Sequence, residues 1–256
     1  MGSAMTAPRR PALLRIRVAL GGLFLQAAFN PERRQGLGLA SALAPLATLW
    51  PQGEPRRRFL ERHLEMFNTN PAMAGPILGA LARLEERAAA GDATALERAE
   101  RLRKGVQGPF AAAGDALVWG GARPAAGLGG GAVALFAGAW GPAIFLLVYN
   151  AVHLGLRVGG VFWGYRRGED AHLLLRAAWL RRALSAAPWI VLAAGAALGI
   201  AALGPWGGAS GPALGGGVAV LAGYVAGRRR VSHGTLLASG AIILGLVAAA
   251  ADGGWF

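Results

Sequence analysis

The feature that most constrains the fold is a long stretch without charge. From Pro124 to Leu156 the chain contains no Asp, Glu, Lys or Arg. A membrane helix needs about 20 consecutive, mostly apolar residues, so this stretch is long enough to span a bilayer. Charged residues make up only 15% of the chain and the mean hydropathy is +0.42, whereas soluble domains carry about 25% charged residues. The sequence therefore predicts an all-α integral membrane protein.

The predicted transmembrane region covers residues 126–256. Gly141-Pro142 interrupts its first apolar stretch, which predicts either a kinked helix or a hairpin that dips into the bilayer. Three further windows meet or approach the length of a membrane helix: Ala183–Gly204, Gly211–Gly227 and Gly234–Ala251. In this fold class, N-terminal amphipathic and broken or re-entrant helices precede a C-terminal transmembrane region.

Basic residues set the expected orientation. The formal net charge is +13, but the arginines flank apolar segments instead of forming one face, so we expect no nucleic-acid partner. The two clusters are Arg166, Arg167, Arg176, Arg181 and Arg182, and then Arg228–Arg230. The positive-inside rule places both clusters in the cytoplasm. We therefore expect a multi-pass protein with a cytoplasmic N-terminal region, and Trp255-Phe256 outside unless the last segment is re-entrant.

The first 29 residues form the predicted N-terminal amphipathic segment. Arginines precede an apolar run, which imitates a secretory signal, but no small-x-small cleavage site follows. Leu13, Ile16, Leu20, Leu23 and Phe24 recur at helical spacing. This spacing favours an amphipathic helix at the membrane interface.

Residues 30–125 form a region of short apolar segments. Gln35–Gly53, Met66–Ala82 and Gly105–Gly114 carry no charge but are too short, or too broken by Gly and Pro, for ordinary spans. They fit discontinuous helices around a transport site, or equally the core helices of a cytoplasmic domain. Charged helices are predicted between them, over Glu54–Glu65 and over Leu81–Arg103 with a break near Gly91-Asp92.

No catalytic or metal-binding arrangement is present in the sequence. The chain has no cysteine, and its four histidines, His63, His153, His172 and His233, do not have the spacing of a metal motif. The glycine-rich stretch at residues 127–131 lacks the Lys-Ser/Thr ending of a phosphate-binding loop. We therefore predict no catalytic residue, no metal and no cofactor.

Several stretches in a fixed order resemble a known family. They are Asn30-Pro31-Glu32-Arg33-Arg34-Gln35-Gly36-Leu37-Gly38, Arg62-His63-Leu64-Glu65-Met66-Phe67-Asn68-Thr69-Asn70-Pro71, Leu84-Glu85-Glu86, Gly105-Val106-Gln107-Gly108-Pro109-Phe110-Ala111-Ala112-Ala113-Gly114-Asp115 and Arg123-Pro124. In this order they resemble the IID component of the mannose/fructose/sorbose family of the bacterial phosphotransferase system. The resemblance extends from about Phe24 to Asp170.

The resemblance implies a function and a set of partners. A IID component pairs with a IIC component, and together they carry a hexose-type sugar across the inner membrane as oligomers of IIC–IID pairs. Cytoplasmic IIA and IIB components pass phosphate to the sugar through phosphohistidines. The IID component is not itself phosphorylated, so the resemblance gives His63 no phosphoryl role and leaves open whether this chain counts as part of an enzyme.

The stretch around Asn68, Thr69 and Asn70 is the main candidate site. These side chains are neutral donors and acceptors that suit sugar hydroxyls, and Glu65 precedes them. We expect all four to contact sugar or the IIC component. The alternative is that Asn68 and Asn70 cap helix ends and Glu65 caps the turn. Pro71 ends the preceding helix, because the residue before proline disfavours helical geometry.

Asp115 is the second candidate. It is the one charged residue between Gly105 and Ala122, and an ionisable group at membrane depth is costly and usually functional. Arg123 is its predicted charge partner, although Asp115 could instead be an exposed N-cap after Gly114. Together with Pro71, the residues Gly108, Pro109 and Gly114 form the structural part of the motifs.

A rival function remains open. Met66 and Arg34 depart from the usual family pattern. The chain could therefore be a non-transporting regulatory or scaffold subunit that docks cytoplasmic phosphotransferase proteins.

Overall fold

The computed structural model describes residues 11–203, which are almost entirely helical. By their contacts these residues form two compact units: residues 11–115 with 151–181, and residues 116–150 with 182–203. The predicted windows Gly211–Gly227 and Gly234–Ala251, the cluster Arg228–Arg230 and the terminal Trp255-Phe256 lie outside the described residues. The division into segments 1–29, 30–125 and 126–256 stays a prediction.

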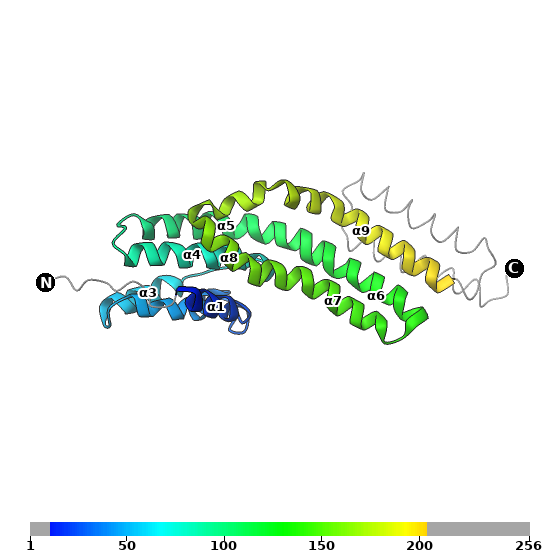
Figure 1. The fold of residues 1–256 in the computed structure, drawn as a ribbon, viewed down its shortest axis with the longest axis horizontal. Helices are drawn as coiled ribbons and strands as arrows, with labels where there is room; N and C mark the ends of the chain where they lie inside the picture. Colours follow the sequence, from blue (N-terminus) through cyan, green and yellow to red (C-terminus); the bar gives the residue numbers. More distant parts are fainter. Residues whose placement is uncertain (1–10, 204–256) are drawn as a thin grey trace. The chain divides into compact units, whose positions relative to one another are not determined.

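The first unit is built around one helix, α4. Its elements are α1 (Pro11–Gly22), α2 (Gly36–Leu43), η1 (Ala44–Leu49), α3 (Glu54–His63), η2 (Pro71–Met73), α4 (Ala74–Ala89), α5 (Ala95–Gly114), η4 (Gly155–Gly159), α8 (Gly160–Arg167) and η5 (Gly168–Arg176). Helix α4 packs against α8, α5 and α1 (Figure 1). Residues 74–82 of α4 are all buried, so this uncharged segment is covered by the unit's own helices.

Small residues allow α4 and α8 to approach closely. A Cβ atom at Gly79 would lie 1.9 Å from the carbonyl oxygen of Val161, and one at Gly164 would lie 2.0 Å from that of Pro76. Both neighbours are backbone atoms, so a side chain at either glycine would force the helices apart. This close packing through glycine is typical of helices in membranes.

The turn between α4 and α5 confirms the predicted break near Gly91-Asp92. Helix α4 ends at Ala89, and Gly91 has a φ of 98°, a left-handed conformation that glycine adopts without strain. Helix α5 then begins at Ala95.

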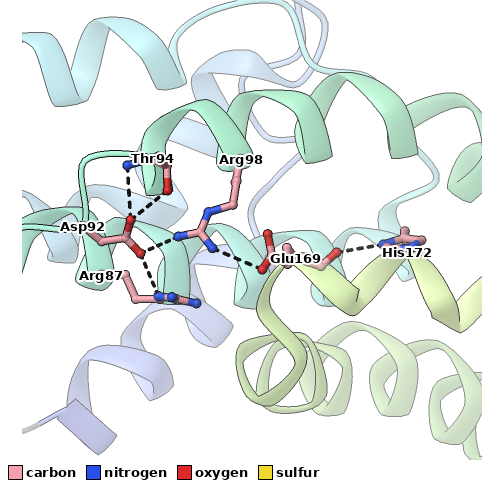
Figure 2. A network of polar contacts seen from close by, with 6 residues as sticks. All are labelled: Arg87, Asp92, Thr94, Arg98, Glu169 and His172. Carbon is pink, nitrogen blue, oxygen red and sulfur yellow. Dashed lines mark hydrogen bonds and ion pairs between the residues drawn. The ribbon is translucent and has the colours of Figure 1, made fainter.

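A polar network fixes this turn to η5. Its members are Arg87, Asp92, Thr94, Arg98, Glu169 and His172 (Figure 2). The Asp92 carboxylate contacts Arg87 Nε at 3.1 Å and Arg98 Nη2, while Arg98 Nη1 lies 3.2 Å from Glu169 Oε1. Burial opposes ionisation of Asp92, but hydrogen bonds from Thr94 and Arg98 outweigh it and lower the pKa of its carboxyl group.

The second unit contains η3 (Asp115–Ala122), α6 (Arg123–Ala137) and most of α7 (Trp140–Leu154) and α9 (Ala178–Leu203). Helices α6 and α7 form a hairpin, which turns at Gly138 with a φ of 52°. The Gly141-Pro142 pair lies in the first turn of α7 and allows contact with α6, because a Cβ at Gly141 would lie 2.4 Å from the carbonyl oxygen of Gly130. The uncharged stretch therefore forms two helices that turn at Gly138, just before the predicted interruption, and a dip of this hairpin into the bilayer stays a prediction.

Two helical stretches are long and apolar enough to cross a membrane, Trp140–Arg176 and Ala178–Gly199. Large apolar side chains in the second unit are left uncovered by the described chain. Phe136, Trp140 and Leu147 are each about 70% exposed or more, at 76%, 69% and 72%. In water such a surface would be an aggregation hazard, whereas lipid solvates it.

Helix α1 and the turn after it have an apolar face. Leu13, Ile16, Leu20 and Phe24 are all exposed, at 45% or more, while Val18 is fully buried against the unit. These exposures do not test the amphipathic character of the segment, which stays a prediction. Its location at the membrane interface stays a prediction.

Candidate functional site

Three motif segments meet at residues 65–70, which we call the 65–70 loop. The first segment pairs with the backbone of Phe67. Gln35 N donates to Phe67 O at 2.8 Å and Phe67 N donates to Arg33 O at 3.3 Å. Gly36 is required beside this pairing, because a Cβ there would lie 2.3 Å from the carbonyl oxygen of Glu65.

The side chain of Gln35 holds the next residue. It is 1% exposed, its Nε2 donates to Thr69 O at 2.8 Å, and its Oε1 accepts from Thr69 N at 2.9 Å. This amide takes the place of the strand partner that an extended segment otherwise needs to satisfy its buried backbone groups. Residues 34 positions apart in the sequence are thereby fixed together.

The third segment, in α5, holds the loop from another side. Asn68 N donates to Gln107 Oε1 at 2.8 Å, and Thr69 Oγ1 donates to Gln107 O at 3.2 Å. Gly108 and Pro109 follow and are exposed. Pro109 lies inside α5 and has no N–H, so one hydrogen bond of that helix is missing at this point.

Asn70 connects the loop to Asp115. Its Nδ2 donates to Asp115 Oδ1 at 2.8 Å, and its Oδ1 accepts from Ala72 N at 3.0 Å, so it also caps η2. Gly114 makes room for this side chain, because a Cβ there would lie 2.4 Å from the Asn70 Cβ. Helical backbone continues from α5 through Asp115 into η3, so Asp115 is no N-cap.

The predicted site residues divide into two groups by exposure. Thr69 and Asn70 are buried, at 5% and 3% exposure, and their polar atoms bond within the chain. Asn68, Glu65 and Asp115 are exposed. The five residues therefore lie along α5 between Arg103 and Asp115, and three of them present polar atoms outward.

Arg123 has an aromatic contact. Its guanidinium lies 5.1 Å from the centroid of the Trp119 ring, within the range of a cation–π interaction. The partner that the structure gives Asp115 is Asn70, and the pairing of Asp115 with Arg123 stays a prediction.

Sequence reasoning missed a buried carboxylate beside this site. Glu85, in α4, is 0% exposed and accepts from Arg62 at 2.8 and 2.7 Å and from Trp50 Nε1 at 3.1 Å; His63 Nε2 lies 2.9 Å from it. Burial alone would raise the pKa of Glu85, but hydrogen bonds from Arg62 and His63 outweigh it and hold that pKa below its usual value. Helical periodicity could have found it, since Glu85 follows the buried Leu81 by one turn.

This carboxylate also accounts for His63. The ring is 3% exposed, packs edge-on against Phe59 at a centroid distance of 4.8 Å, and contacts Glu85. A phosphoryl donor has no access to a ring in this position. Within residues 11–203, no group of three or more His, Cys, Asp and Glu side chains is arranged to hold a metal ion.

Comparison with known proteins supplies the family. Residues 14–199 match the family described as "PTS system mannose/fructose/sorbose family IID component". This match covers well over half of the chain and includes all the motifs that form the site. The chain belongs to the IID component family.

Individual relatives agree with this assignment. The IID component described here is 37% identical over 156 residues to the "PTS system mannose-specific EIID component" of Escherichia coli (strain K12), covering 58% of this chain and 55% of the relative. It is 38% identical over 146 residues to the "PTS system sorbose-specific EIID component" of Klebsiella pneumoniae, covering 57% and 53%. The chain thus spans about half the length of the curated relatives it matches.

A solved structure has the same architecture. The chain is similar to a chain in "CryoEM Structure of Mannose Transporter ManYZ and Microcin E492 (MceA) complex", with a TM-score of 0.59 and 26% sequence identity, covering 93% of this chain and 96% of that one. Together with the helical content and the two apolar helical stretches, this confirms that the IID component is an all-α membrane protein.

Proposed function

We propose that this IID component is the membrane subunit of a mannose-family sugar permease. With a IIC component it translocates a hexose-type sugar across the bacterial inner membrane, and IIA and IIB components phosphorylate that sugar on arrival. Phosphorylation traps the sugar because the product is charged. The pair assembles into larger oligomers, with the Arg-rich segment at residues 166–182 and the N-terminal region in the cytoplasm.

The observation that carries the proposal is the construction of the 65–70 loop. Two other motifs hold this loop, one through Gln35 and the other through Gln107 and Asp115. A loop held from several sides by side-chain hydrogen bonds has a defined shape. Such rigidity is what a recognition site needs to keep its exposed polar groups in place.

The exposed groups suit a sugar. Asn68 offers a neutral amide that both donates and accepts, and the Glu65 and Asp115 carboxylates accept hydrogen bonds from hydroxyls. A hydrogen bond between a hydroxyl and an ionised carboxylate is among the stronger kinds. In this proposal Thr69 and Asn70 position the loop, while Asn68, Glu65 and Asp115 contact the sugar or the IIC component.

The sugar class comes from the relatives. The matched proteins are described as mannose-specific, sorbose-specific and fructose permease components. Each name is a property of that protein. For this chain they support a hexose-type substrate as the proposal.

Uptake of labelled mannose, fructose and N-acetylglucosamine tests the proposal. The cells should carry the complete set of IIA, IIB and IIC components, with either the wild-type IID component or Asn68→Ala. Gln52→Ala is the matched control, because it removes an exposed amide outside the 65–70 loop. Copurification with the IIC component shows whether each variant still assembles.

The expected result is accumulation of a phosphorylated sugar with the wild type and Gln52→Ala, and its loss with assembled Asn68→Ala. If no sugar enters with the wild type although all components are present, transport is refuted. Phosphorylation-dependent docking of the cytoplasmic components would then be the function to measure.

A further inference from the structure

A buried arginine lies directly behind the 65–70 loop. Arg103, in α5, is 3% exposed, and its Nη2 contacts Glu65 Oε2 and lies 3.6 Å from Glu100 Oε1. Burying a charged group is costly unless it is paired. These two carboxylates are the ion-pair partners of Arg103 within residues 11–203.

The two carboxylates depend on Arg103 to different degrees. Glu100 also accepts from Lys104 Nζ at 2.6 Å, and that hydrogen bond is the main reason why the pKa of Glu100 is lowered. Glu65 has a single ion-pair partner in the described part of the chain, which is Arg103. Loss of Arg103 would therefore leave Glu100 held by Lys104 and release Glu65.

The backbone of Glu65 is held as well. Its carbonyl oxygen packs against Gly36, where no side chain fits. Its side chain is 49% exposed, with Oε2 on Arg103. Glu65 thus presents a half-exposed carboxylate, held through one oxygen, three residues before Asn68.

One nitrogen of the Arg103 guanidinium is left unpaired by the described residues. Within residues 11–203 the second terminal nitrogen of Arg103, Nη1, is buried without a hydrogen-bond partner. An apolar residue of similar size often stabilises such a position better than a buried ion pair does. The unpaired nitrogen therefore calls for an explanation other than the stability of α5.

We propose that Arg103 is a positioning residue for sugar recognition: it holds the Glu65 carboxylate at the outer edge of the 65–70 loop without touching the sugar itself. This inference rests on the proposed function, because it needs Glu65 to contact the transported sugar. It adds a residue from α5, whose role the loop sequence alone does not indicate.

The test is a double-mutant cycle on uptake kinetics in cells with the complete set of components. The variants are Glu65→Gln, Arg103→Met and the double substitution, with Glu100→Gln as the control that removes the other carboxylate from the same guanidinium nitrogen. Initial rates against sugar concentration give KM, and the amount of IID component copurified with IIC gives the rate per assembled complex.

The expected result is that Glu65→Gln and Arg103→Met each raise KM about tenfold, while the maximal rate per assembled complex changes by less than about twofold. The double variant should be no worse than Glu65→Gln alone, because Arg103 acts through Glu65. Arg103→Lys should recover part of the affinity, since it keeps the positive charge, and Glu100→Gln should leave KM within about twofold of wild type.

Other outcomes overturn the inference. If the effects of Glu65→Gln and Arg103→Met multiply in the double variant, Arg103 acts independently of Glu65. If Arg103→Met only reduces the amount of assembled complex and leaves KM unchanged, its role is structural. Should that variant fail to assemble, Arg103→Lys in the wild-type and Glu65→Gln backgrounds provides the same comparison. Absence of uptake in the wild type refutes the proposed function itself, which distinguishes the two failures.

Discussion

Gly114 offers the sharpest test of how the site is built. It is the last residue of α5 and lies against the Asn70 side chain, so Gly114→Ala places a methyl group 2.4 Å from the Asn70 Cβ. That atom is attached directly to the backbone and no rotamer change can move it. The 65–70 loop must shift away from α5, and the Asn70–Asp115 hydrogen bond must stretch or break.

The expected cost follows from three contributions. Overpacking a well-packed site costs about 1–3 kcal/mol, and loss of the hydrogen bond costs about 0.5–1.5 kcal/mol. Replacing a helical glycine by alanine stabilises the helix by about 1 kcal/mol, which offsets part of this cost. The net destabilisation is roughly 2 kcal/mol, which lowers Tm by about 4–8 °C in a protein of this size.

Thermal unfolding of the purified IID component, followed by tryptophan fluorescence, measures this shift. Gly105→Ala is the matched control, because it is the same substitution in the same helix and its Cβ would meet nothing within 4 Å. It should raise Tm by about 2–4 °C through helix propensity alone. If both variants shift Tm in the same direction, the close approach of Gly114 to Asn70 is not present in the protein and the description of the site is wrong.

Three further predictions concern buried groups of the first unit. Glu85→Gln should destabilise the protein by about 3 kcal/mol, because it leaves Arg62 without its carboxylate. In an unfolding series against pH, the difference in Tm from wild type should be constant above about pH 5 and shrink progressively as the pH falls further, because a carboxyl group with a lowered pKa gives stability that is lost as the pH falls through that pKa. Gln35→Glu removes the amide donor to Thr69 O and should lower the free energy of unfolding by about 1–3 kcal/mol in the same assay. Unchanged stability would show that the side chain of Gln35 does not hold Thr69. Gly79→Ala should reduce the yield of folded protein, because its Cβ would meet a backbone oxygen at 1.9 Å, and a normal yield would contradict this packing.

Local chemistry accounts for the elements that sequence reasoning predicted. The break between α4 and α5 follows from Gly91, whose backbone adopts a conformation that other residues avoid. The i,i+4 pairs of α5, Glu97 with Arg101 at 3.4 Å and Glu100 with Lys104 at 2.6 Å, follow from helical spacing. These features depend on residues a few positions apart, so the chain need not be folded to reveal them.

The site was predicted only in part, for the same reason. Asn68, Thr69, Asn70 and Glu65 were found because a family motif runs through them, and Asp115 because it stands in an otherwise uncharged segment. Their division into exposed and buried groups depends on contacts across 34 to 45 residues of sequence. Asn68 and Asn70 are the same residue type in the same short stretch, so no local sequence pattern shows that one is exposed and the other buried.

The sequence by itself determined the fold class. A chain with so few charges and such long apolar stretches can bury its backbone polar groups only as helices in a membrane. Its glycines also decided where helices can turn or approach closely, because glycine has no side chain to clash with a neighbouring backbone or to restrict φ.

Only the tertiary structure decided which groups share a site. Residues 151–181 pack in the first unit, although residues 116–150, which precede them in the sequence, belong to the second. It also places Glu85 against Arg62 and His63, and Arg103 against Glu65. The physical reason is that a buried charge is tolerated only beside a partner, and that partner is supplied by whichever helix packs there.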